Sequence, residues 1–191
     1  ALASHTDYAV IYSHAGGRIG PVIDGFWDSG VIRQVNKFFE TIASLKMDAA
    51  VYDRLNSEAH FVRAYQYFGL AKRYGGVPII KDVQVVNQGG DNSALFIPRA
   101  TEKETWDFIL EECDSAIANL PNTVNAQEGS FRATKWAGYA LKSRVALYAA
   151  SVAKYWNNAA LTGPAVDAKL VGGMTIVDAN NYYLQCINAS K

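Results

Sequence analysis

Residues 57–80 read SEAHFVRAYQYFGLAKRYGGVPII, and this stretch decides how the neighbouring sequence is interpreted. Phe61, Tyr65 and Phe68 recur at the spacing of one helix face, which predicts that their rings pack into a wide buried face and do not bind a ligand. Gly75-Gly76 provides a left-handed stop, and a proline two residues later prevents the helix from continuing. The stretch is therefore the second half of a predicted helix.

Working outward, apolar side chains at helical spacing predict helices over about 27–44, 47–74, 101–119 and 134–154, with a further one beginning near Asp178. Thr101 and Glu104 form a T-x-x-E capping box, and Thr134 can cap the next helix. The side chains that we expect to face inward are Val31, Val35, Phe38 and Ile42, then Leu55, Ala59 and Val62, then Trp106, Ile109, Leu110, Cys113 and Ile117, then Ala137, Leu141, Val145 and Tyr148.

These helices predict a mainly α fold of antiparallel helix pairs. Small residues would allow the helices to approach closely, among them Ala59, Ala64, Ala137, Ala140 and Ala146. Such pairs are typical of tetratricopeptide-like, right-handed α-superhelical scaffolds with long loops, although a strict 34-residue period is absent. We expect one domain over residues 1–191: a loop (1–26), a helix pair (27–74), a loop (75–100) that is non-helical with room for one or two short strands, a second helix pair (101–155), and a loop with the start of the next helix (156–191).

Composition bounds the class of protein. Half of the 191 residues are hydrophobic and 19% are charged, which is enough apolar material for a core. The 18 Lys and Arg balance the 18 Asp and Glu, so nothing indicates a nucleic-acid partner or a polybasic membrane tail. No stretch approaches the roughly 18 apolar residues of a membrane span. Cys113 and Cys186 resemble small buried hydrophobic residues, and a disulfide between them stays open as an alternative.

The sequence contains no recognisable catalytic or metal-binding motif. HExxH, GxSxG and P-loop patterns are absent, and we expect His60 to be a packed or surface residue. The carboxylate pairs Glu102/Glu104 and Glu111/Glu112 lie on the first turn or the polar face of one predicted helix, where they complement the helix dipole or stay solvated. We therefore predict a protein that is not an enzyme and has no cofactor.

The opening stretch also resembles the hallmark helix of the SusD/RagB family, E-A-x-F-x-R-A-x-x-Y-F-x-L-x-x-x-Y-G-G-V-P. The matching residues are Glu58, Ala59, Phe61, Arg63, Ala64, Tyr67, Phe68, Leu70, Tyr74, Gly75, Gly76, Val77 and Pro78. Three more segments are similar to family motifs in order and spacing: VIRQVNKFFETI, IPRATEKETWDFILEECDSAIANLP and GSFRATKWAGYALKSRVALYAAS. Two local departures are the Cys113-Asp114 order and the inserted Ser130-Phe131. The resemblance spans residues 28 to about 155.

The resemblance implies a lipid-anchored, surface-exposed protein of the outer membrane in Bacteroidetes-type bacteria. Family members bind oligosaccharides or other nutrients and cover a SusC-like TonB-dependent transporter. They are much longer than this chain, which implies that it is the N-terminal portion, without the lipid-anchored cysteine and the C-terminal half. The matched motifs belong to the scaffold, where Glu58 and Arg63 are expected to bridge helices.

The resemblance implies that ligand residues come from loops and from the C-terminal portion. In a loop, a flat ring can stack on a sugar face beside hydrogen-bonding groups. The candidates are Trp27, Asp28, Arg18, His14 and Tyr12 in the glycine-rich segment before the first helix, and Tyr155 and Trp156 in the sequence KYWNN. Each set has a structural alternative: Trp27 could staple the helix start, and the asparagines Asn157 and Asn158 could cap a helix end.

Two further functions stay open at this point. One is a helix-repeat scaffold that docks a protein partner and has no small-molecule ligand of its own. The other is a helical glycoside hydrolase, which requires two carboxylates about 5–10 Å apart in a cleft. No convincing carboxylate pair is visible in the sequence. A nutrient-binding protein, most often for a glycan, is therefore the first hypothesis.

Overall fold

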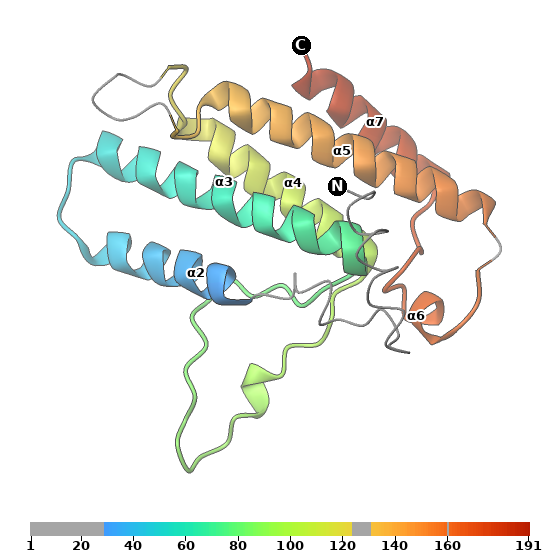
Figure 1. Cartoon of the computed structure of the whole chain (residues 1–191), viewed down its shortest axis with the longest axis horizontal. Coiled ribbons are helices and arrows are strands. Elements are labelled where there is room, and N and C mark those ends of the chain that lie inside the picture. The colour runs from blue at the N-terminus through green and yellow to red at the C-terminus, as the bar shows by residue number, and fades with distance from the viewer. Residues whose placement is uncertain (1–28, 124–130, 160) are drawn as a thin grey trace, which may run out of the picture.

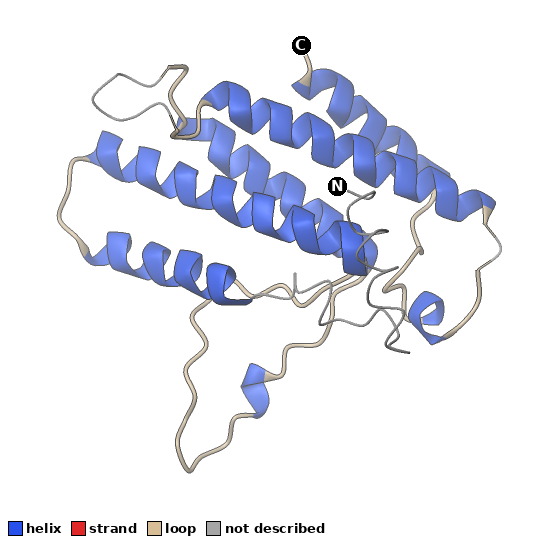
Figure 2. Cartoon of the chain, viewed as in Figure 1, coloured by secondary structure: helices blue, strands red, loops and turns tan. Residues whose placement is uncertain are grey.

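The computed structural model of the chain describes residues 29–123, 131–159 and 161–191. In order, the elements are α2 (Ser29–Ser44), α3 (Ala49–Tyr74), the short 3-10 helix η1 (Ser93–Leu95), α4 (Glu102–Asn119), α5 (Lys135–Asn158), the short α6 (Pro164–Asp167) and α7 (Ile176–Ala189). Figure 2 shows that the described residues form helices and loops only. The mainly α prediction is confirmed, and the strands considered for the loop before α4 are not present in the described residues.

The helices form antiparallel neighbours, as predicted. α3 packs between α2 and α4, α4 contacts α5, and α7 packs along α5 (Figure 1). The loop between α3 and α4 projects away from the helices and returns to them only at its two ends. This arrangement confirms the tetratricopeptide-like helix pairs. No helix in the described part of the chain is both long and apolar enough to cross a membrane.

Side chains fix where each helix begins. Asp48 accepts hydrogen bonds from the backbone of residues 50 and 51 at the start of α3, and Thr101 with Glu104 forms the predicted capping box of α4. Thr134 caps α5, and Thr175 forms a second capping box at α7. These bonds satisfy backbone N–H groups that have no partner inside the helix. α5 extends one turn beyond the predicted end near residue 154.

The core lies where α3, α4 and α5 meet. Its largest fully buried side chains include Trp106, Tyr67, Ile109 and Val145. On α5 the buried face consists mainly of alanines, namely Ala146, Ala149, Ala150 and Ala153, all with no exposed surface. Such small side chains let α4 and α7 approach α5 closely. The prediction of close approach holds for Ala59, Ala64 and Ala146, whereas Ala137 is half-buried and Ala140 is exposed.

Several aromatic and apolar residues that were predicted to face inward are exposed instead. Tyr65 is 63% exposed, Val62 44%, Tyr148 39% and Phe38 38%. Their helical spacing is correct. Tyr65 and Val62 lie on a part of α3 that no described helix covers fully, so only part of its wide apolar arc is buried. Phe38 on α2 and Tyr148 on α5 line open hollows. Phe68 is buried and Phe61 is half-buried, as expected for a packed face. The prediction that all three rings of the hallmark helix are buried is therefore wrong for Tyr65.

A buried polar cluster joins three helices around Arg63. Its guanidinium donates to both oxygens of Glu112 on α4, at 2.7 and 2.8 Å, and to Asn36 on α2 at 3.0 Å. The Asn36 side chain in turn donates to the backbone carbonyls of residues 80 and 82 in the α3–α4 loop. His60 contributes a 2.9 Å contact to Glu112. The prediction that Arg63 bridges helices is confirmed.

The remaining carboxylates and cysteines follow a similar pattern. Glu58 of α3 pairs with Arg132, just before α5, as predicted for a bridging residue. Glu112 is only 5% exposed, which corrects the expectation that it is solvated. Burial alone would raise the pKa of Glu112, but the hydrogen bonds from His60 and Arg63 outweigh it and hold that pKa below the usual 4.5. Cys113 is buried, Cys186 is half-buried, and both are free thiols.

The Gly75-Gly76 turn is held by two separate segments. Gly75 has a φ of +68°, and its N–H donates to the carbonyl of residue 71 at the end of α3. Gly76 donates to the carbonyl of Leu170, and Arg99 donates to the carbonyls of Gly76 and Tyr74. A Cβ at Gly76 would lie 2.0 Å from the carbonyl oxygen of residue 100. Glycine is required at both positions because the start of α4 and the 163–175 segment lie too close to this turn to leave space for a Cβ.

Candidate functional site

The described part of the chain contains a cleft where the end of α3 approaches the second half of α5. Its volume is about 460 Å³, within the roughly 300–1,000 Å³ range of ligand pockets. The lining residues come from α3, α5, the start of α4 and the segment before α7; they are Ala71, Lys72, Arg73, Tyr74, Gly75, Glu102, Tyr148, Ser151, Val152, Tyr155, Trp156 and Val171. We call this hollow the α3–α5 cleft.

Aromatic rings form one wall of the α3–α5 cleft. Tyr148 and Tyr155 lie seven residues apart on α5, so both side chains point to the same side of the helix. Tyr148 makes an edge-to-face contact with Phe68 at a centroid distance of 5.3 Å, and Tyr155 makes one with Trp156 at 5.0 Å. Tyr155 is 62% exposed, so its ring is available for stacking.

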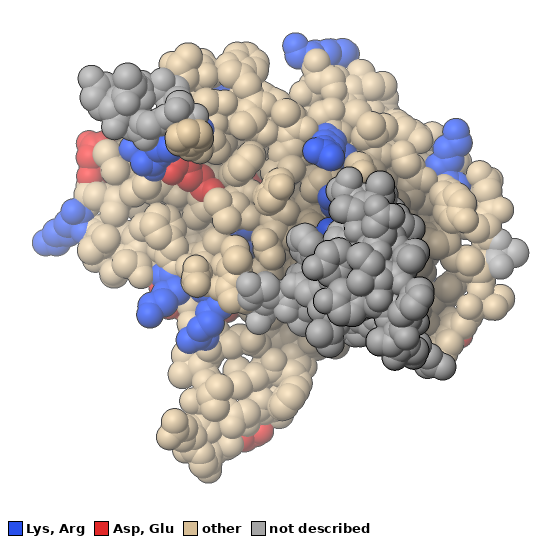
Figure 3. Space-filling view, viewed as in Figure 1, with Lys and Arg blue, Asp and Glu red and all other residues tan. Residues whose placement is uncertain are grey.

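Basic side chains form the opposite edge. The Lys72 ammonium lies 4.5 Å from the centroid of the Phe68 ring and 5.7 Å from that of Tyr148, both within range of a cation–π contact. Burial lowers the pKa of Lys72, and the nearby charges of Arg73 and Arg144 lower it further. The lysine therefore belongs to a local concentration of positive charge. Figure 3 shows Lys and Arg side chains spread over the visible face, with few acidic ones.

The floor of the cleft carries the carboxylate of Glu102. This residue is 4% exposed, accepts a 2.6 Å hydrogen bond from the N–H of Gly172, and lies 3.5 Å from the indole nitrogen of Trp106. Burial raises its pKa above the usual 4.5, although these donors and the indole of Trp156 act in the opposite direction. Trp156 approaches this carboxylate with its buried Nε1, which makes no hydrogen bond of normal geometry among the described residues. The expectation that Glu102 stays solvated is corrected, because its carboxylate is enclosed. Glu102 and Glu104 both lie in the first turn of α4, as predicted, and Glu104 forms the capping box.

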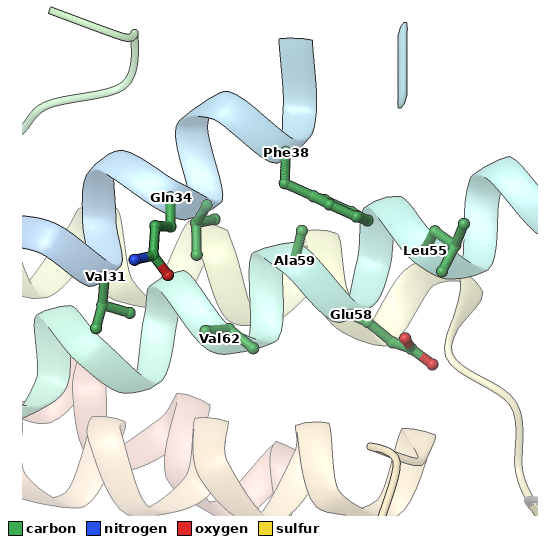
Figure 4. A pocket seen from close by; sticks show the side chains of 8 residues that line it. Val31, Gln34, Phe38, Leu55, Glu58, Ala59 and Val62 are labelled. Carbon is green, nitrogen blue, oxygen red and sulfur yellow. The ribbon is translucent and has the colours of Figure 1, made fainter. Parts of the chain in front are cut away.

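A second hollow, of about 320 Å³, runs between α2 and α3 (Figure 4). Its lining is almost entirely apolar and includes Val31, Phe38, Leu55 and Val62. The Glu58 carboxylate at its edge is already paired with Arg132. This α2–α3 groove lacks the converging polar groups that a sugar needs, and it is suited to contact with an apolar surface.

The structure places two of the predicted ligand residues in one site. Tyr155 and Trp156 lie side by side in the α3–α5 cleft. Asn157 instead donates to the carbonyls of residues 153 and 174 and ties α5 to the segment before α7, which supports its structural interpretation. The other candidates, Trp27, Asp28, Arg18, His14 and Tyr12, lie outside the described residues.

Sequence reasoning predicted only Tyr155 and Trp156 among the residues that line the cleft, and three of the missed residues show why. Tyr148 was assigned to the core, although its spacing to Tyr155 was a usable signal. Lys72 follows Phe68 by one helical turn, and this relation becomes meaningful only when α5 lies alongside. Glu102 reaches the site through its contact with residue 172, which no local pattern encodes. Within the described ranges, no group of three His, Cys, Asp or Glu side chains is arranged to hold a metal ion.

Comparison with known families identifies the scaffold. A family model described as SusD-like, "Starch-binding associating with outer membrane", matches residues 25–147. This chain belongs to the SusD-like family. The match includes the hallmark helix and its Gly75-Gly76 stop, together with the first half of α5. No curated protein sequence matches the chain.

Solved structures of SusD-like proteins share this fold. A SusD-like protein from Bacteroides fragilis NCTC 9343 is 36% identical, with a TM-score of 0.58 over 78% of this chain and 27% of its own. A laminarin-binding SusD-like protein is 22% identical, with a TM-score of 0.56 over 69% of this chain and 28% of its own. Surface glycan-binding protein A from Bacteroides fluxus is 21% identical, with a TM-score of 0.56 over 70% and 28%. This chain thus spans about a quarter of the length of these structures.

Proposed function

We propose that this SusD-like chain is part of a cell-surface nutrient-binding protein, with a glycan as the ligand, that works with a TonB-dependent outer-membrane transporter. It forms the N-terminal part of a single SusD-like domain and is held at the outer membrane by a lipid anchor. It binds its ligand without catalysis. Support comes from the family's starch-binding description and from similar structures described as laminarin-binding and glycan-binding.

One observation carries the binding role: the α3–α5 cleft combines exposed rings with polar groups. Tyr155, Trp156 and Tyr148 present flat faces of the kind that stack on a pyranose ring. Ser151 and the basic residues beside them offer hydrogen-bond donors to hydroxyl groups. The predicted residues Trp27, Asp28, Arg18, His14 and Tyr12 are proposed as further ligand contacts.

Affinity electrophoresis of the full-length protein through a panel of polysaccharides tests this function. At least one polysaccharide should retard the protein, and Tyr155→Ala should weaken that retardation about 2- to 10-fold, the value of one aromatic contact. Tyr65→Ala is the matched control, because Tyr65 is equally exposed (63% against 62%) and lies outside the cleft. If Tyr155→Ala is retarded as strongly as the unmodified protein, the α3–α5 cleft is excluded as the glycan-binding site. Trp27→Ala tests the loop candidates in the same gel.

The α2–α3 groove favours a second candidate function, a helix-repeat scaffold that docks a protein and binds no small ligand itself. Its exposed apolar lining, including Phe38 and Val62, is typical of a protein contact. The two functions differ in one result. A full-length protein that co-purifies with its transporter but is retarded by no polysaccharide would support the scaffold and exclude glycan binding.

A further inference from the structure

We propose that the α3–α5 cleft selects acidic glycans. Lys72 binds a carboxylate or sulfate group, Arg144 adds positive charge beside the cleft, and the rings of Tyr148 and Tyr155 stack on the sugars. This inference rests on the proposed glycan-binding function and adds the chemical class of the ligand. Neither the family description nor the described relatives specify a charged sugar.

Lys72 is the first part of the argument. It is exposed and lines the cleft, and its ammonium is directed over the rings of Phe68 and Tyr148. It makes no ion pair with any carboxylate among the described residues. A cation held between two aromatic rings is partly dehydrated and has no counter-charge, so an anionic ligand group would complete its environment.

Arg144 is the second part. It lies one helical turn before Tyr148 on α5, beside the cleft but outside the residues that line it. Arg144 also makes no ion pair within the described ranges, whereas Lys142, two residues earlier on the same helix, is paired with Asp114. Lys72 thus lies inside the cleft over the ring of Tyr148, and Arg144 adds a second cation one turn away on α5, outside the cleft lining. A guanidinium binds a carboxylate or sulfate through two parallel hydrogen bonds.

The carboxylate in the cleft does not cancel this charge. Glu102 is the only acidic residue that lines the α3–α5 cleft among the described residues, and it is 4% exposed. One of its oxygens accepts the N–H of Gly172 at 2.6 Å, and no ion pair links it to Lys72. The exposed lining is thus basic and aromatic, while the acid is enclosed in the floor. Such a surface attracts anionic ligands and leaves ring faces for stacking.

The test compares polymers that differ only in charge, using the full-length protein. Polygalacturonate is compared with its carboxyl-reduced form, and dextran sulfate with dextran, by affinity electrophoresis and by calorimetry with oligomers of each. We expect stronger binding to at least one acidic polymer than to its neutral counterpart, and weaker binding as salt rises from 50 to 200 mM. The member of the pair that binds distinguishes a carboxylate from a sulfate.

Variants test whether the preference for acidic polymers arises in the cleft. Lys72→Gln should weaken binding to the acidic polymer about two- to fivefold, and more than it weakens binding to the neutral counterpart. Arg144→Gln, at a position outside the cleft lining, should have a smaller effect in the same direction. Lys37→Gln on α2 makes the same change of charge at an exposed position away from the cleft and should have no effect. Circular dichroism confirms that each variant is folded.

Each outcome decides a different claim. Equal binding to an acidic polymer and its neutral form, with a polysaccharide still bound, overturns the acidic-glycan inference and leaves the proposed function intact. An equal loss in Lys37→Gln and Lys72→Gln also overturns it, because net charge alone would then explain the preference. Retardation by none of the polysaccharides overturns the proposed function together with this inference.

Discussion

Replacing Arg63 by methionine should lower the unfolding free energy of this chain more than almost any other substitution of one charged residue. Arg63 is 6% exposed and donates to both oxygens of Glu112, which is 5% exposed. It also donates to Asn36, and its guanidinium lies 4.6 Å from the centroid of the Phe39 ring. Methionine retains much of the apolar stem but leaves Glu112 buried with His60 as its remaining partner.

The expected loss is about 3–5 kcal/mol of unfolding free energy, the cost of leaving one member of a buried ion pair uncompensated. This is a large share of the roughly 5–15 kcal/mol that stabilises a domain. The pair itself is worth less than this loss, because both charges were dehydrated to form it. Arg63→Met/Glu112→Leu should therefore be more stable than Arg63→Met alone, although Asn36 and His60 lose partners.

Urea unfolding followed by far-ultraviolet circular dichroism measures these differences, with Lys37→Met as the matched control. Lys37 is exposed, so its replacement should stay within about 0.5 kcal/mol of the unmodified protein. A loss below about 1 kcal/mol for Arg63→Met would refute the idea that this cluster holds the helices together. A double variant less stable than Arg63→Met would refute the argument that the unpaired charge causes the loss.

The same pair predicts how stability changes in acid. The pKa of Glu112 is lower in the folded than in the unfolded chain, where it has its usual value of 4.5. The pair therefore stabilises the folded state at pH values above 4.5, and this stabilisation is lost as the pH falls through the folded-state pKa. Unfolding free energy should therefore decrease below about pH 4.5 in the unmodified protein. The decrease should be smaller in Arg63→Met, and an equal slope in both proteins would assign the acid sensitivity to other groups.

Three further predictions concern stability and use the same urea assay. Burial raises the pKa of Glu102, so its stabilising contribution is complete below pH 4.5 and is lost as the pH rises through the folded-state pKa; Glu102→Gln should flatten this decline, and an unchanged pH profile would contradict it. Gly76→Ala should cost about 3 kcal/mol or more, because its Cβ would overlap the carbonyl of residue 100. Gly69→Ala, whose Cβ would have open space inside α3, should instead stabilise the chain by about 0.5–1 kcal/mol. Equal effects of the two substitutions would refute the close approach at Gly76. Thr101→Ala removes the capping box of α4 and should cost about 1 kcal/mol, and no loss would mean that water replaces the cap.

Local sequence determined the helices and their ends. The capping box at Thr101, the cap at Thr134 and the bond from Gly75 to residue 71 join residues a few positions apart, so these helix ends are visible in the sequence. The contacts of Gly76 with residues 100 and 170 are not. The predicted inward face of α4 was also correct. α3 and α5 both pack against α4, so every apolar residue that was predicted to face inward on this helix is buried. The hallmark pattern also identified the family, and it lies within the residues that the SusD-like family model matches.

Only the tertiary structure decided which apolar residues are exposed and which groups form a site. Tyr65 and Phe68 have the same helical spacing, yet one is exposed and the other buried, because neighbouring helices cover only part of α3. Glu102 and Glu104 differ by two positions, but contact with residue 172 encloses the first and leaves the second at the surface. Lys72 of α3 lies over the ring of Tyr148 on α5, so this contact joins two separate helices. Burial and charge depend on contacts between residues far apart in the chain, and periodicity within one helix carries no information about them.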